Sequence, residues 1–299
     1  MKAVRASTAR RNTIYGLLFA LPWIIGFLAF TAYPILASLY YSFTEFVGIG
    51  TPKWIGGENY YNLFHDELFW TSLYNTVYYV SLAVPIGFVI GLGLALLLNS
   101  NLKEVGIYRT LVYLPYVLPA VAVSFIWLWM LNPYYGLVNL FLSTVFKVQG
   151  PGWFSDPKWA KPAFVMLAQW GAGGSAVIFL SAIKDVPREM LESAEIDGAG
   201  WWTKFSKIII PMISPVILYH IITALFGGFQ IFTTAYIATN GGPANSTLFY
   251  VLYLYRNAFQ YNKMGYASSM AWMLFILVLI ITLIIFRTSA RWVFYQGGE

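Results

Sequence analysis

Six stretches of this 299-residue chain contain no Asp, Glu, Lys or Arg over at least 22 consecutive positions. They cover residues 12–44, 68–102, 110–146, 162–183, 208–255 and 264–286. A helix needs roughly 20 predominantly apolar residues to cross the hydrocarbon core of a bilayer. Each stretch is long enough to do so, and we therefore expect an all-α integral membrane protein with six transmembrane helices.

The composition of the chain agrees with a membrane protein. Hydrophobic residues make up 59% of the chain and charged residues only 10%, whereas about a quarter of the residues in soluble domains are charged. The chain has no cysteine, which excludes disulfides and thiolate metal sites. We expect one transmembrane domain over residues 1–299.

The apolar stretches predict where the helices lie. We expect them near residues 13–42, 71–99, 108–131, 160–183, 212–239 and 265–288. The longest charge-free stretch is interrupted at Gly241-Gly242-Pro243. The segment after it, about 247–262, is too short to span, and its Tyr and Phe residues are typical of an interfacial helix on the outer side. Four prolines are expected to kink the spans that contain them: Pro85, Pro115, Pro119 and Pro215.

Basic residues predict the orientation in the membrane. With the N-terminus inside and six spans, twelve of the 18 Lys and Arg residues lie on the cytoplasmic side and six on the other. This bias follows the positive-inside rule and places both termini in the cytoplasm. The net charge of +6 is then a topology signal, and no basic soluble domain suggests a nucleic-acid partner.

One long polar interval, Lys184–Pro211, separates the fourth and fifth expected spans and is cytoplasmic in this topology. It reads KDVPREMLESAEIDGAGWWTKFSKIIIP and holds five of the twelve acidic residues. Gly198 and Gly200 divide it into two expected helices, because Gly ends helices at little cost. Asp185 is a candidate N-cap for the first helix, and Pro211 is expected to close the second.

The two expected helices carry different faces. Glu189, Glu192 and Glu195 recur at i, i+3 and i+6 and form an acidic face. The second helix has an apolar face, formed by Trp201, Phe205 and Ile208. An amphipathic loop lying on the membrane is one interpretation, but an acidic face is poorly suited to an anionic cytoplasmic leaflet. A docking element for a basic groove on a partner is favoured.

The expected spans lack ionisable residues at mid-depth apart from His220, which more often packs than functions. Ion-driven carriers and channels usually need such groups, and energy for transport must then come from elsewhere. Thr223, Gly227, Gln230 and Thr234 form a polar stripe at helical spacing. Such residues either hydrogen-bond between helices or line a path for a polar, uncharged solute. The candidate pathway residues are Asn75, Gln169, Thr223, Gln230, Thr234 and Tyr236.

The polar interval resembles the EAA loop of ATP-binding-cassette importer permeases. The shared pattern is Glu192-Ser193-Ala194, three residues, Gly198, nine residues, and Ile208-Ile209-Ile210-Pro211. Ser193 and Ile210 depart from the family pattern by conservative exchanges. Four further segments resemble the carbohydrate-uptake branch of these permeases, which includes maltose, glycerol-phosphate and oligosaccharide permeases. They are GGENYYNLFHDELFWTSLYNT, YRTLVYLPYVLPAVAVSFIWLWMLNPYYGLVN, ATNGGPANSTLFYVLYLYRNAF and RWVFYQGGE.

The resemblance implies a mechanism and a set of partners. Two homologous permease subunits would form the pathway in a bacterial or archaeal plasma membrane, and two copies of a cytoplasmic ATPase would dock on their loops. An extracytoplasmic binding protein would deliver a sugar. ATP and Mg²⁺ would be bound by the ATPase, because this chain has no GxxxxGK[ST] phosphate loop. This chain would be non-catalytic. The implied coupling residues are Glu192, Ser193, Ala194, Asp197, Gly198 and Pro211.

Three alternatives stay open from the sequence. The first is an importer permease for another solute, such as an amino acid or a polyol phosphate. The departure at Thr233-Thr234 from the acid that often follows Phe232 in the family leaves the solute contacts undefined. An ion-coupled carrier lacks intramembrane charges, and a membrane enzyme lacks a catalytic set.

Overall fold

The computed structural model describes residues 2–100 and 103–294. The end of the RWVFYQGGE motif, residues 295–299, and positions 101–102 of the expected inner segment lie outside the described residues. The chain forms two compact units, one of residues up to His65 with Tyr255–Met273, and one of Asp66–Leu254 with residues from Leu274 on.

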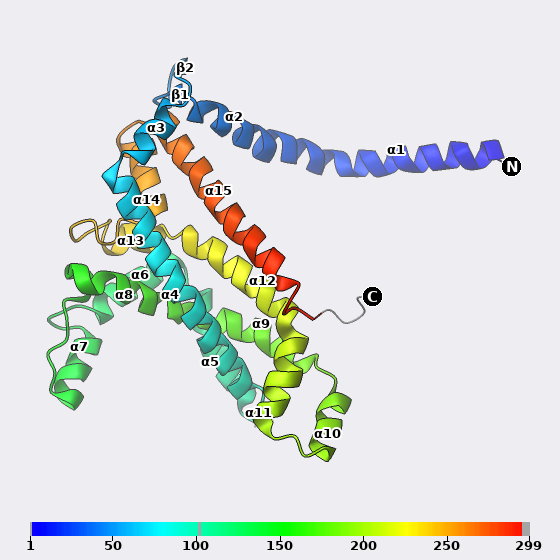
Figure 1. The fold of residues 1–299 in the computed structure, drawn as a ribbon, viewed down its shortest axis with the longest axis vertical. Coiled ribbons are helices and arrows are strands. Elements are labelled where there is room, and N and C mark those ends of the chain that lie inside the picture. Colours follow the sequence, from blue (N-terminus) through cyan, green and yellow to red (C-terminus); the bar gives the residue numbers. More distant parts are fainter. Residues whose placement is uncertain (1, 101–102, 295–299) are drawn as a thin grey trace. The chain divides into compact units, whose positions relative to one another are not determined.

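The first unit begins with a continuous helical run (Figure 1), in which α1 (Lys2–Phe27) and α2 (Tyr33–Ser42) are joined by one π-helical turn. Two short antiparallel strands follow, β1 (Thr44–Glu45) and β2 (Lys53–Trp54), and then α3 (Glu58–Phe64). The buried Asn59 side chain donates hydrogen bonds of 2.9 Å to the carbonyls of Ser42 and Thr44. These bonds fix the chain where α2 ends. The unit also contains a π-helical segment, Arg256–Gln260, and the first part of α15 (Met264–Ser289).

The second unit contains the rest of α15, from Leu274 on, and the remaining helices, except that Tyr255 at the end of α14 belongs to the first unit. They are α4 (Glu67–Leu98), α5 (Val105–Val117), α6 (Ala120–Met130), α7 (Leu137–Phe141), α8 (Pro157–Ala168), α9 (Ala172–Lys184), α10 (Arg188–Ile196), α11 (Trp201–Lys204), α12 (Ile210–Phe229), α13 (Thr233–Ala238) and α14 (Tyr250–Tyr255). Helices α4, α9 and α12 pack side by side (Figure 1). Their apolar side chains form a buried cluster that includes Leu98, Ile183 and Ile213.

The mostly helical fold agrees with the expected all-α class. In the described part of the chain, five helical runs are long and apolar enough to span a membrane. They are Tyr15–Ser42, Glu67–Leu98, Pro157–Lys184, Trp201–Ala238 and Met264–Ser289. The bent pair α5 and α6 makes a sixth if it is counted as one span. The structure thus supports five or six spans.

The third expected helix, 108–131, is broken rather than kinked. Helices α5 and α6 differ in direction by 98°. Leu118 and Pro119 between them have extended backbones with ψ of 136° and 139°. A proline disfavours helical backbone in the preceding residue, and Pro119 therefore ends α5 at Val117. Pro85, Pro115 and Pro215, in contrast, lie inside helices that continue past them.

The fifth expected helix, 212–239, also differs from its prediction. It ends at Phe229, and α13 begins at Thr233 after a non-helical turn. At its start, a π-helical turn at Phe205–Ile209 joins α11 to α12 without interruption. Pro211 was expected to end a helix, but it lies at the second position of α12, directly after the π-helical turn, and the helical run continues past it.

Candidate functional site

The EAA-type loop folds as two helices around a left-handed glycine. Helix α10 ends at Ile196, Gly198 has a φ of +79°, and α11 begins at Trp201. A residue with a Cβ would be strained at this φ, which explains the glycine. The expected N-cap role of Asp185 is wrong, because Asp185 is the C-cap of α9 and Pro187 precedes α10 without a side-chain cap. Pro187 cannot cap, since its side chain has no acceptor.

One side of the loop is anchored to the helical bundle. Val186 is buried, and Leu191 and Phe205 pack on the same apolar cluster as Leu98 and Ile213. The loop therefore touches the ends of α4, α9 and α12 together.

The other side of the loop is open to solvent and carries the predicted coupling residues. Glu192, Ser193, Asp197 and Gly198 are exposed, whereas Ala194 is half-buried. Ile196 and Trp202 are 87% and 71% exposed. The loop thus presents carboxylates beside uncovered apolar side chains.

The predicted acidic face is only partly free. Glu195 forms an ion pair with Lys204 of α11, which ties the two loop helices together. Glu189 and Glu192 have no ion-pair partner among the described residues. Of these two, only Glu192 lies in the EAA-type pattern.

Asn75, a predicted pathway residue, is occupied by structural hydrogen bonds. It is 2% exposed, and its amide nitrogen donates to the carbonyls of Asn245 (2.9 Å) and Leu248 (3.2 Å). Its Oδ1 accepts a 3.0 Å hydrogen bond from Lys161 Nζ. These contacts match the helix-packing interpretation of the intramembrane amides.

Lys161 is a member of this hydrogen-bonded group that the sequence did not reveal. Its ammonium lies over the rings of Tyr74 and Tyr78, 4.7 and 5.1 Å from their centroids. This geometry favours cation–π attraction. The sequence signal was weak, because Lys161 lies one residue before a charge-free stretch and its partners are 83 or more positions away.

The expected polar stripe on the fifth helix does not exist as one face. The helix break after Phe229 separates Thr234 from Thr223. Thr223 Oγ1 donates to the carbonyls of Tyr219 and His220 in its own helix. Gln230 is exposed at the C-cap of α12, and Tyr236 is exposed with its ring stacked on Phe232.

Gln169, in contrast, lines a partly open cavity of about 360 Å³ among the helices, which we call the bundle cavity. Its walls come from α4, α5, α8, α9, α12 and the 3₁₀ turn at Gln169–Gly171. Gln169 Nε2 donates to the carbonyls of Val165 (2.8 Å) and Ala83 (3.4 Å), whereas its Oε1 is buried without a partner. Of the predicted pathway residues, only Gln169 lines this cavity.

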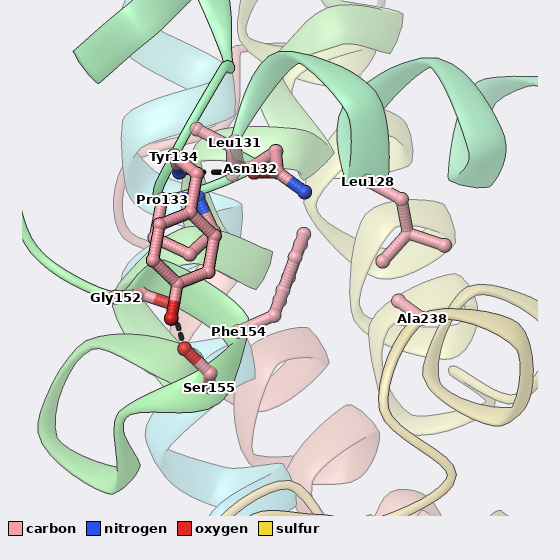
Figure 2. A pocket seen from close by; sticks show the side chains of 9 residues that line it. All are labelled: Leu128, Leu131, Asn132, Pro133, Tyr134, Gly152, Phe154, Ser155 and Ala238. Carbon is pink, nitrogen blue, oxygen red and sulfur yellow. Dashed lines mark hydrogen bonds between the residues drawn. The ribbon is translucent and has the colours of Figure 1, made fainter.

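A second cavity, of about 340 Å³, lies among the loops that follow α6 and precede α8 (Figure 2). Figure 2 shows Phe154 and the Asn132 amide pointing into it. Asn132 Oδ1 already accepts the backbone N–H groups of Tyr134 and Tyr135, and Ser155 Oγ donates to the carbonyl of Gly152. Asn132 Oδ1 and Ser155 Oγ are therefore engaged in hydrogen bonds within their own turns.

The outer segment expected near 247–262 is helical over Tyr250–Gln260. Its first residues pack on α4 and α8, where the Phe249 ring lies 5.5 Å from Tyr79 and 5.3 Å from Phe164. Tyr253 donates a 2.5 Å hydrogen bond to the Asp66 carboxylate at the start of α4. Burial also raises the pKa of the Tyr250 phenol above its ordinary value.

Comparison with known proteins gives relatives along nearly the whole chain. The chain is 40% identical over 299 residues to the probable ABC transporter permease protein YesP of Bacillus subtilis (strain 168), covering 99% of this chain and 96% of that protein. It is 35% identical to the lactose transport system permease protein LacF of Rhizobium radiobacter, covering 95% and 97% of the two chains.

A solved structure is similar in fold. The crystal structure of the bacterial alginate ABC transporter, in complex with an alginate pentasaccharide-bound periplasmic protein, contains a chain that matches with a TM-score of 0.82. The two chains are 25% identical, and the match covers 96% of each. Residues 83–294 match the family described as binding-protein-dependent transport system inner membrane component. The chain belongs to this family and is an inner-membrane component of an ABC transporter.

Proposed function

We propose that this chain is the permease subunit through which an ATP-driven importer moves a sugar or oligosaccharide across the membrane. The similar proteins include a lactose permease and a chain of an alginate transporter. The lining of the bundle cavity favours an uncharged solute, because it contains no Lys or Arg to pair with a phosphate. This favours a sugar over a polyol phosphate.

The loop Lys184–Pro211 is, in this proposal, the site where ATP-driven motion enters. The observation that carries it is the two-sided loop: apolar side chains anchored to α4, α9 and α12, and exposed acids on the other side. Glu192 would pair with a basic residue of the ATPase, with Ser193, Ala194 and Asp197 beside it. Gly198 would hold the turn, and Pro211 would start the helix that the loop moves.

The remaining assembly follows from the same proposal. A second homologous permease would complete the pathway, and two copies of a cytoplasmic ATPase would bind ATP and Mg²⁺, which leaves this chain non-catalytic. A binding protein would deliver the solute from outside, as the periplasmic protein in the alginate transporter complex suggests. The six-span topology would place both termini and the coupling loop in the cytoplasm of a bacterial or archaeal cell.

Replacing Glu192 by Gln is expected to reduce solute-stimulated ATP hydrolysis by about tenfold or more. Losing one partner of a buried, hydrogen-bonded charge pair at an interface costs about 2–5 kcal/mol. The measurement is ATP turnover and sugar uptake in proteoliposomes that hold this permease, its second permease, the ATPase and the binding protein.

Glu189→Gln is the matched control, because Glu189 lies on the same helix, is exposed and stands outside the EAA-type pattern. It is expected to keep wild-type coupling. Equal activity of wild type and Glu192→Gln would refute the docking role. Uptake of amino acids but not sugars by the wild-type complex would refute the proposed solute class.

A further inference from the structure

The segment that follows α15 is attached to the start of α12 through its main chain. Helix α15 ends at Ser289, and the Phe294 N–H donates a 2.8 Å hydrogen bond to Ser214 Oγ, 80 positions earlier in the chain. Figure 1 shows the end of α15 beside the first turns of α12. We propose that Ser214 is a positioning residue for transport, which makes the end of α15 move together with the coupling loop. The proposal rests on the proposed function, since it gives a role in coupling to a residue next to that loop.

The Ser214 hydroxyl fills a gap in the hydrogen bonding of α12. In an α-helix each carbonyl accepts the N–H of the residue four positions later. Pro215 has no N–H, and the Pro211 carbonyl therefore lacks this donor. Ser214 Oγ donates a 2.6 Å hydrogen bond to the same carbonyl. Its hydrogen is thus used within α12, and its oxygen is left to accept the Phe294 N–H.

Burial makes these two bonds hard to replace. Ser214 is 2% exposed, and water has little access to its oxygen. A hydroxyl is a small group that donates and accepts at the same time, which suits serine to this position. Alanine would remove both bonds, whereas threonine would keep the hydroxyl.

Side-chain packing does little to hold the end of α15. Four apolar side chains on its last turns are more than half exposed: Ile280, Leu283, Ile284 and Phe286. In the segment that follows, the Trp292 and Phe294 rings are exposed as well. The N–H groups of Trp292 and Val293 both donate to the Ser289 carbonyl and close the helix. The bond from Phe294 to Ser214 is therefore an attachment that does not depend on buried side chains.

Ser214 lies where the coupling loop continues into the bundle. Helix α11, the π-helical turn at Phe205–Ile209 and α12 form one uninterrupted run. Pro211 is the last residue of the EAA-type pattern, and Ser214 follows it at i+3 on the same side of the helix. A movement of the loop that shifts Pro211 would carry Ser214 with it. Through the bond to Phe294, the end of α15 would follow.

Replacing Ser214 by Ala tests the attachment in two ways. In the purified full-length chain, hydrogen exchange at the Phe294 amide is expected to become about tenfold faster, as loss of one hydrogen bond predicts. In proteoliposomes that hold the complete transporter, the amount of solute taken up per ATP hydrolysed is expected to fall about threefold or more. A loss of folded complex alone would leave this ratio unchanged.

Ser214→Thr is the conservative variant and is expected to restore both the exchange rate and the transport ratio. Ser72→Ala is the matched control. Ser72 is fully buried in α4, and its hydroxyl donates a 2.8 Å hydrogen bond to the Phe69 carbonyl three residues earlier, as Ser214 does to Pro211. This control removes the same kind of bond without touching the segment after α15. It is expected to keep the wild-type ratio.

A second pair of variants breaks the attachment from its other side. Phe294→Pro removes the donor N–H and leaves the bond between Ser214 and Pro211 in place. It is expected to lower the transport ratio as far as Ser214→Ala does. Phe294→Ala keeps the N–H, removes only the exposed ring and is expected to behave as wild type. An equal loss in both variants would assign the effect to the ring and contradict the proposal.

Two results would overturn the positioning role. Wild-type exchange at the Phe294 amide in Ser214→Ala would show that the bond does not hold the segment. Faster exchange with an unchanged transport ratio would show a bond that is structural only. If Ser214→Ala does not yield monodisperse protein, the Phe294→Pro and Phe294→Ala pair decides. A wild-type transporter that takes up amino acids but no sugar would refute the proposed solute class, whereas the ratio for that solute would still test Ser214.

Discussion

Gly173→Ala is expected to prevent most of the protein from accumulating in a folded form. Gly173 is buried in α9, and an added Cβ would lie 1.9 Å from the Val112 carbonyl oxygen and 3.2 Å from the Tyr113 Cα, both in α5. These are backbone atoms, and the two helices would have to move apart. Overpacking in a closely packed interior costs about 1–3 kcal/mol and occasionally more. Small residues at helix contacts allow such close approach in membranes.

The measurement is the yield of monodisperse protein after extraction, together with the melting temperature. We expect a decrease of about 2–12 °C, because 1 kcal/mol corresponds to about 2–4 °C in larger domains and the expected cost is about 1–3 kcal/mol. Gly93→Ala is the control, since no atom lies within 4 Å of an added Cβ there. It lies inside α4, where Ala is favoured over Gly by about 1 kcal/mol. Wild-type stability of Gly173→Ala would contradict the contact between α5 and α9.

The positions of the long apolar helices could be predicted because they follow from charge alone. A charged residue is costly in the hydrocarbon core, and the ends of α4 and α15 accordingly lie near the ends of two charge-free stretches. The turn at Gly198 was equally predictable, because few residues other than glycine adopt its φ. These features depend on local sequence.

The breaks in the helices could not be predicted in the same way. Pro119 was expected to kink a helix, but the angle of 98° depends on what the two halves pack against, and α6 packs on α13. The break after Phe229 lacks a proline at the point of interruption. The prediction of a polar stripe depended on a helix that continued to Thr234. It was wrong because the helix ends at Phe229.

The members of the bundle cavity were also hidden from sequence reasoning. In the sequence, Gln169 stands out as an isolated intramembrane amide, and His220 has the surroundings of a packing residue. Ser175 and Tyr79 carried no signal, because they are common residue types in apolar segments. Their convergence requires the packing of α4, α9 and α12, which are far apart in the chain.

Asn75→Leu is expected to release the segment Asn245–Leu248 from α4. Leucine has the branched shape of asparagine but no donors, and the carbonyls of Asn245 and Leu248 would lose their hydrogen bonds. Lys161 Nζ would lose its 3.0 Å bond to the side-chain oxygen. At about 1–3 kcal/mol for each buried group left unsatisfied, this change is expected to lower the melting temperature by several degrees.

Hydrogen exchange at the Tyr250 amide measures the release directly. This N–H donates 2.8 Å to Thr76 Oγ1, one residue from Asn75, and its protection is expected to fall about tenfold or more in Asn75→Leu. Lys161→Met is the matched control, because it keeps both Asn75 donors and removes only the ammonium. It is expected to leave the Tyr250 amide protected. If Asn75→Leu instead keeps both stability and protection but abolishes sugar uptake, Asn75 lines the solute path, and its hydrogen bonds to Asn245 and Leu248 do not hold the segment.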